Sequence, residues 1–137
     1  MYKFLDHKSD QLVEVEAEGV PELFEESAKA FFDTIVDISK VEPKLEFEIE
    51  LYETSIERLL YKFLNELLYL FDTKGAVFSK FEAQFDEENL KLDIKMWGEH
   101  FDPKKHTPKY EIKAITLHNF KVWKENGNWM ARFLFDL

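Results

Sequence analysis

The sequence contains no cysteine, only four glycines and four prolines, and no long apolar run. The absence of cysteine excludes disulfides, thiolate zinc sites and cysteine nucleophiles. Four glycines leave little material for the glycine-rich loops that bind nucleotide phosphates. No stretch approaches the roughly 18 apolar residues of a membrane span, and the first residues lack the apolar centre of a signal peptide. We therefore expect a cytoplasmic protein without a membrane partner.

Acidic residues clearly outnumber basic ones, 28 to 18, which gives a formal net charge of −10. A surface of this charge repels the phosphate backbone of nucleic acids, so direct binding of RNA is not expected. It favours cations or basic partner surfaces instead, although the charge taken alone is more simply explained as keeping the protein in solution. The 137 residues are 45% hydrophobic, enough to form one domain, residues 1–137, with its own core.

Two strands, each followed by a helix, are expected in the first half of the chain. Hydrophobic and acidic residues alternate over 11–18 and over 45–51, which is typical of half-buried strands, with Leu45 facing inward in the second. The segments that follow each strand place apolar residues at helical spacing, over 21–37 and 54–71.

The ends of the second helix carry recognisable signals. Thr54, with Glu57 three residues later, predicts a capping box at its start. Gly75 is suited to the left-handed turn that often ends a helix.

The second half of the chain indicates β structure. Segments 77–85 and 90–97 form a predicted hairpin, and 98–109 reads as an irregular loop. Residues 112–124 form one long strand, or two strands with a bulge, and 126–128 make a tight turn before a final strand that runs to the end. The fold class is therefore α+β, with two amphipathic helices packed on a mainly antiparallel sheet.

The carboxyl terminus is a candidate cation site. Asp136 lies beside the α-carboxylate of Leu137, and the alternating apolar run from Trp129 predicts that a sheet holds this end in place. Carboxylates are the hard oxygen ligands that Ca²⁺ and Mg²⁺ prefer. Asp10 would add a third carboxylate, but spacing alone favours a simple turn for the polar segment 6–10. Spacing alone does not bring Asp10 to the terminus.

The expected loop mixes acids, bases and an aromatic residue, and such a loop is either a binding element or a solvated connection. It includes Glu99, Lys104 and His106. Lys113 and His118 follow in the next expected strand, where they fit an acid–base pair or an outward polar face. No nucleophile is evident and no histidine pair has the helical spacing of a zinc site, so the polar face is favoured.

Several segments, in the same order over nearly the whole chain, resemble the archease family. They are His7-Lys8-Ser9-Asp10, Val41-Glu42-Pro43, Asn65 to Asp72, Gly98-Glu99 with Phe101-Asp102-Pro103 and His106, Glu111 to His118, and Phe135-Asp136-Leu137. The resemblance implies an archease-like fold. It also implies an accessory protein, not an enzyme, for the RtcB-type tRNA-splicing RNA ligase. Such a protein promotes guanylylation of the ligase and its multiple turnover, and meets RNA only through the ligase.

The resemblance also implies a divalent cation held by Asp10, Asp136 and the main-chain carboxylate of Leu137. Ca²⁺ is the first expectation, with Mg²⁺ or Mn²⁺ as alternatives. On this hypothesis the contact face for the ligase comprises five residues, Glu99, Lys104, His106, Lys113 and His118. Two other functions stay open. One is a general protein chaperone, and the other is a metal-dependent hydrolase that uses Asp10, Asp136 and His118.

Overall fold

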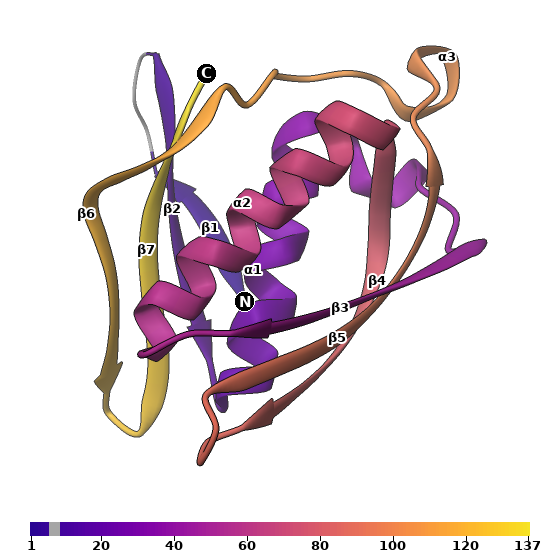
Figure 1. Ribbon diagram of the computed structural model, residues 1–137. Helices are drawn as coiled ribbons and strands as arrows, with labels where there is room; N and C mark the ends of the chain where they lie inside the picture. The colour runs from indigo at the N-terminus through magenta and orange to yellow at the C-terminus, as the bar shows by residue number, and fades with distance from the viewer. Residues whose placement is uncertain (6–8) are drawn as a thin grey trace.

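The structure is a computed structural model that describes residues 1–5 and 9–137 (Figure 1). The elements in chain order are β1 (Tyr2–Leu5), β2 (Asp10–Ala17), α1 (Val20–Ile35), the 3-10 turn η1 (Ile38–Lys40), β3 (Leu45–Tyr52), α2 (Ile56–Lys74), β4 (Ala76–Asp86), β5 (Lys91–His100), α3 (Pro103–His106), β6 (Ala114–Glu125) and β7 (Asn128–Asp136). Among these described residues, no helix is long and apolar enough to cross a membrane.

The strands form two antiparallel sheets. One has the order β1-β2-β7-β6 and the other the order β3-β5-β4. Figure 1 shows α1 and α2 lying between the two sheets. The predicted α+β class is confirmed, although the strands divide between two sheets instead of forming one.

Helix α1 joins the two sheets through adjacent phenylalanines. The Phe31 ring packs edge-on against Phe135 of β7, with centroids 5.7 Å apart. The next residue, Phe32, contacts Phe78 and Phe81 of β4 at 5.6 and 6.1 Å. All five rings are buried, and this aromatic layer forms the centre of the core.

Helix α2 begins one residue later than its sequence signal predicts. The cap is Ser55, whose hydroxyl accepts a hydrogen bond from the Arg58 amide, so the prediction of Thr54 as the cap is wrong. Glu57 does not complete a capping box, because its carboxylate accepts from the Val122 amide of β6. Gly75 ends the helix in the left-handed conformation at φ 62° and ψ 31°, as predicted.

The structure corrects two expectations for the strands and loops and decides between two alternatives for a third. The expected loop 98–109 contains the end of β5 and the four-residue helix α3. The pairing of β6 with β7 shifts register between Thr116 and Lys121, which confirms the bulge over a single regular strand. Leu45 was predicted to face inward, but it is 53% exposed at the first position of the edge strand β3.

Candidate functional site

Strand pairing brings the predicted cation ligands together. In the β2–β7 ladder, Asp10 lies directly opposite Asp136. The Leu137 amide continues the ladder by donating to the Ser9 carbonyl at 3.3 Å. On the other side of β7, the Lys113 amide donates to the Asp136 carbonyl at 2.7 Å. The terminus is therefore held between its two neighbours in the sheet.

The two aspartates lie on the sheet face turned away from the helices. Val13 and Phe133 are fully buried on the inner face, and each lies three residues from its aspartate, so strand alternation places the aspartates outward. Residues directly opposite on one face have Cβ atoms about 5 Å apart, and like charges there destabilise a sheet. A divalent cation would offset this repulsion. Together with the Leu137 carboxylate, the pair offers an all-oxygen donor set that fits Ca²⁺ or Mg²⁺.

Part of the polar segment before Asp10 lies outside the described residues, namely Asp6, His7 and Lys8. Within the described part of the chain, no three His, Cys, Asp or Glu side chains gather into a metal site. The proposed site therefore depends on the terminal carboxylate as its third ligand.

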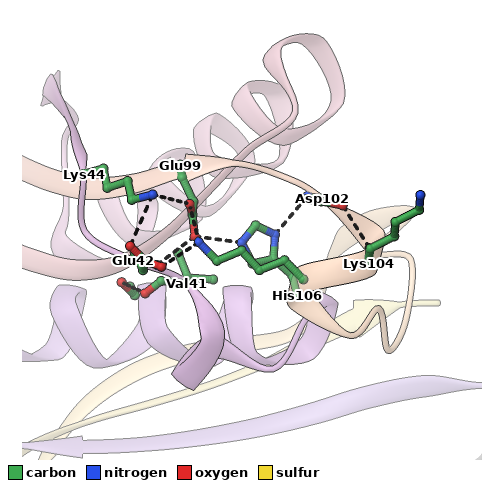
Figure 2. A network of polar contacts seen from close by, with 9 residues as sticks. Val41, Glu42, Lys44, Glu99, Asp102, Lys104 and His106 are labelled. Carbon is green, nitrogen blue, oxygen red and sulfur yellow. Dashed lines mark hydrogen bonds and ion pairs between the residues drawn. The ribbon is translucent and has the colours of Figure 1, made fainter.

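A second polar centre lies where β5 leads into α3. Figure 2 shows the Glu99 carboxylate at the middle of a network. It accepts hydrogen bonds from the Glu42 amide, from Lys105 Nζ and from His106 Nε2, each at 2.9 Å. Lys44 adds a longer ion pair at 3.9 Å. One carboxylate thus joins the end of β5, the segment before β3 and helix α3.

The His106 side chain is inside the protein. It has no exposed surface, and its ring stacks on Phe101 with centroids 6.1 Å apart. The Asp102 amide donates to Nδ1 at 2.9 Å, so Nδ1 is unprotonated and the Nε2–H donates to Glu99. The sequence placed His106 on a contact face for a partner, and burial of the ring corrects that placement.

The environment of Glu99 strongly favours its charged form. Burial alone would raise the pKa of the carboxyl, but the hydrogen bonds from the Glu42 amide, His106 and Lys105 outweigh it. They lower the pKa to about 2. The side chain is only 13% exposed. Because its oxygens are occupied internally, Glu99 serves the network and is not available as an outward ligand.

We expect Glu99→Gln to lower the free energy of unfolding by about 2–3 kcal/mol at pH 7. A carboxyl whose pKa is depressed in the folded state stabilises the protein above its unfolded pKa, near 4.5, and this contribution fades as the pH falls towards 2. The difference between wild type and variant should therefore shrink between pH 4.5 and 2. Urea unfolding over this range measures it, with the exposed Glu48→Gln as control. A difference that stays constant with pH would contradict the assignment.

The other three expected contact residues are exposed, namely Lys104, Lys113 and His118. Lys113 lies next to the aspartate pair through its backbone bond to Asp136. His118 is four residues beyond Ala114, the β6 residue paired with Asp136, so it lies roughly 13 Å along the strand from the pair. This separation places no histidine from β6 beside the carboxylates and weighs against the hydrolase hypothesis.

The two centres lie on the same side of the molecule. In Figure 1 the segment between α3 and β6 crosses that side, from α3 to the carboxyl terminus. Two backbone hydrogen bonds hold this segment to the end of α1. The Lys109 amide donates to the Ile35 carbonyl, and the Tyr110 amide donates to the Thr34 carbonyl. A partner that covers this side could touch both centres.

Sequence reasoning missed three members of the Glu99 network. Glu42, Lys44 and Lys105 complete it through ion pairs of 2.9 to 3.9 Å. Their charges were visible in the sequence, but nothing in their spacing shows that the segment before β3 meets α3.

Comparisons with known proteins find relatives over nearly the whole chain. The model of the Archease protein family (MTH1598/TM1083) matches residues 2–137. The chain belongs to the archease family. The protein archease of Pyrococcus furiosus is 40% identical over 139 residues, covering 99% of this chain and 98% of its own. That of Thermococcus kodakarensis is 42% identical with the same coverage.

Solved structures give the same fold. The solution structure of Methanobacterium thermoautotrophicum protein 1598 has a TM-score of 0.88 and 33% identity, and covers 99% of this chain and 98% of its own. A crystal structure from Thermotoga maritima, named as an archease and possible chaperone, has a TM-score of 0.68 and 19% identity over all of this chain and 98% of its own. At that identity, the second likeness concerns the fold alone.

Proposed function

We propose that this protein is an accessory factor of an RtcB-type RNA ligase in the cytoplasm, and that it promotes guanylylation and multiple turnover of that ligase. Membership of the archease family over residues 2–137 is the observation that carries the proposal. The protein itself performs no covalent step. It stabilises the conformation of the ligase that accepts the guanylyl group, because it binds that conformation more tightly than others.

The proposal assigns the acidic end of the β2–β7 ladder to a divalent cation, Ca²⁺ first. Asp10, Asp136 and the Leu137 carboxylate would hold it, and their pairing in adjacent strands supports this role. A bound cation neutralises the repulsion between the carboxylates and so stabilises the junction of the amino-terminal strands with the carboxyl terminus. The neighbouring Lys113 would thereby be held in a constant position.

Charge supports the choice of partner. A ligase that handles a nucleoside triphosphate, a metal and RNA presents a basic surface around its active site. A protein of net charge −10 is steered towards such a surface, while it is repelled by free RNA. Contact with RNA is therefore expected only through the ligase.

The direct test follows transfer of a labelled guanylyl group from GTP to the ligase, with this protein in substoichiometric amount. Faster labelling, together with repeated ligation by each ligase molecule, supports the proposal. With a folded ligase from the same source, unchanged labelling would refute it. Labelled nucleotide or phosphoester hydrolysed by this protein alone, in the presence of metal, would instead support the hydrolase hypothesis.

We expect Lys113→Glu to reduce this stimulation at least about tenfold, equivalent to ~1.4 kcal/mol of binding. The side chain is exposed, while the bond of its backbone amide to Asp136 is kept, so the fold should be unchanged. The proposed cation ligands are unchanged in this variant, so a loss of stimulation with an unchanged calcium response in melting cannot be attributed to a lost metal.

The matched control for this variant is Lys124→Glu. Lys124 lies near the turn of the β6–β7 hairpin, at the other end of β6 from Lys113, and its ammonium is 5.4 Å from the Trp129 ring centroid. The control should stimulate the ligase normally. Full stimulation by folded Lys113→Glu would remove Lys113 from the contact face.

General chaperone activity is the second candidate, and one surface feature favours it. Leu117 is 67% exposed and borders a groove of about 540 Å³ between α2 and β6, beside the Tyr61 and Phe120 rings. An exposed apolar side chain next to a groove is the kind of surface that binds unfolded chains. Suppression of aggregation of unrelated proteins, abolished by Leu117→Ser, would support this function.

A further inference from the structure

Helix α3 is held from within the protein by one buried ring. We propose that Glu99 and His106 are positioning residues that hold α3 so that Lys104 meets an anionic group on the surface of the ligase. This inference rests on the proposed function and deepens it. Of the five expected contact residues, Glu99 and His106 form an internal support, and Lys104 makes the outward contact.

The internal support links the two ends of the four-residue helix α3. His106 is the last residue of α3, and its Nδ1 accepts from the amide of Asp102, the residue that caps the helix. The Asp102 carbonyl in turn accepts from the His106 amide at 2.9 Å. Two hydrogen bonds therefore join both ends of a helix that is too short to be stable alone. The ring sets the shape of the whole turn.

Glu99 connects this turn to the rest of the fold. Its carboxylate holds Nε2 of His106 and Lys105 on one side, and the Glu42 amide on the other. Glu99 belongs to β5, the central strand of its sheet. Its carboxylate therefore fixes the position of α3 relative to a strand that is held on both sides. Loss of the His106–Glu99 bond leaves α3 with its own shape but weakens its tie to the sheet.

Lys104 is the part of α3 that this support presents to solvent. Its backbone amide donates to the Asp102 carboxylate at 2.9 Å, which orients the residue. Its ammonium makes no ion pair or hydrogen bond among the described residues, and Figure 2 shows it pointing away from the network. By contrast Lys105, its neighbour, is bound by Glu42 and Glu99. Lys104 is thus the cation of α3 that can bind an external anion.

Two substitutions at His106 separate its two hydrogen bonds. In His106→Gln the terminal amide nitrogen reaches the place of Nε2 and can still donate to Glu99. In His106→Asn the shorter side chain can replace the acceptor at Nδ1 for the Asp102 amide but cannot reach Glu99. If the tie to Glu99 positions Lys104, we expect Gln to preserve stimulation of the ligase and Asn to weaken it.

The decisive experiment is a double-mutant cycle between His106→Asn and Lys104→Ala, read as the concentration of this protein that gives half-maximal ligase guanylylation. Each single variant should raise that concentration roughly five- to tenfold, with the maximal rate unchanged. The double variant should be no worse than Lys104→Ala alone, because a positioning residue has no effect once its target is gone. Lys124→Ala, at the far end of the β6–β7 hairpin, is the control for loss of a distant cation.

The possible outcomes are distinct. The inference is overturned, while the proposed function stands, in either of two cases. His106→Asn still raises the half-maximal concentration in the Lys104→Ala background, or Lys104→Ala alone leaves that concentration unchanged. Equal loss in Gln and Asn variants also overturns it, since a general structural role would not separate them. If wild type fails to stimulate the ligase, the proposed function and this inference fall together. Should His106→Asn not fold, as judged by its melting curve, Glu99→Gln takes its place in the cycle.

Discussion

Replacing Gly98 with alanine is expected to destabilise the protein by about 3 kcal/mol or more, at the upper end of the cost of overpacking. A Cβ atom at this position would lie 1.9 Å from the Val77 carbonyl oxygen and 2.7 Å from the Phe78 Cα. Both are backbone atoms of β4, and β5 is confined on its other side by β3, where Gly98 is paired with Leu45. Neither strand can move aside without breaking its ladder.

Urea or thermal unfolding measures this effect, with Gly19→Ala as the matched control. At Gly19 the close contact of the added Cβ is with the end of the flexible Glu22 side chain, and the backbone is extended at φ −140°. The control should cost less than about 1 kcal/mol, as expected for a helix N-cap. Equal stability of Gly98→Ala and wild type would show that the two strands are not in this close contact.

The strands and long helices could be predicted because each buries one face only. Alternation over 11–18 predicted β2, and its inward residue Val13 is fully buried. The same reasoning failed at Leu45, because alternation describes the middle of a strand while the first residue of an edge strand extends past the core. Burial of such a residue depends on which element packs against it, and the local pattern of residues does not specify that element.

Helix α3 could not be predicted, because four residues carry no periodicity. It exists through the Asp102 cap and the buried ring of His106. Nothing in the neighbourhood of His106 indicated burial, since two lysines precede it. Its partner Glu99 comes from the preceding strand, and the Glu42 amide from a segment that is distant in sequence.

The proposed cation ligands were predictable as residues, but their meeting at one place was not. Acidic residues near both ends of the chain could be identified, yet their proximity follows from the pairing of β2 with β7, which strand patterns do not determine. The resemblance to the family supplied the missing link. The register then placed Asp10 opposite Asp136 without further assumption.

Asp136→Asn is expected to change the stability of the protein in opposite directions with and without calcium. Without the cation, the variant should be more stable than wild type by a few tenths of a kcal/mol, because it removes one of two like charges that face each other across β2 and β7. With calcium at about 100 times its dissociation constant, wild type should gain ~2.7 kcal/mol and the variant far less.

Calorimetric melting with calcium or with chelator measures both differences, and Glu125→Gln is the matched control. Glu125 is an exposed acid on the same β6–β7 hairpin, opposite Asn128 at its far end, so its neutralisation should leave the calcium response unchanged. A wild-type melting curve that calcium, magnesium and manganese all leave unmoved would rule out the site. A calcium response in Asp136→Asn equal to that of wild type would place the cation elsewhere.

The same variant separates the effect of the cation on folding from its effect on the ligase. Since Asp136→Asn is expected to be fully folded without cation, loss of ligase stimulation in this variant cannot be attributed to unfolding. We expect the stimulation to fall at least about tenfold in calcium, equivalent to ~1.4 kcal/mol. Retained stimulation with an absent calcium response would mean that the carboxylates stabilise the terminus alone. The contact with the ligase would then depend on Lys104 and Lys113 and not on a bound cation.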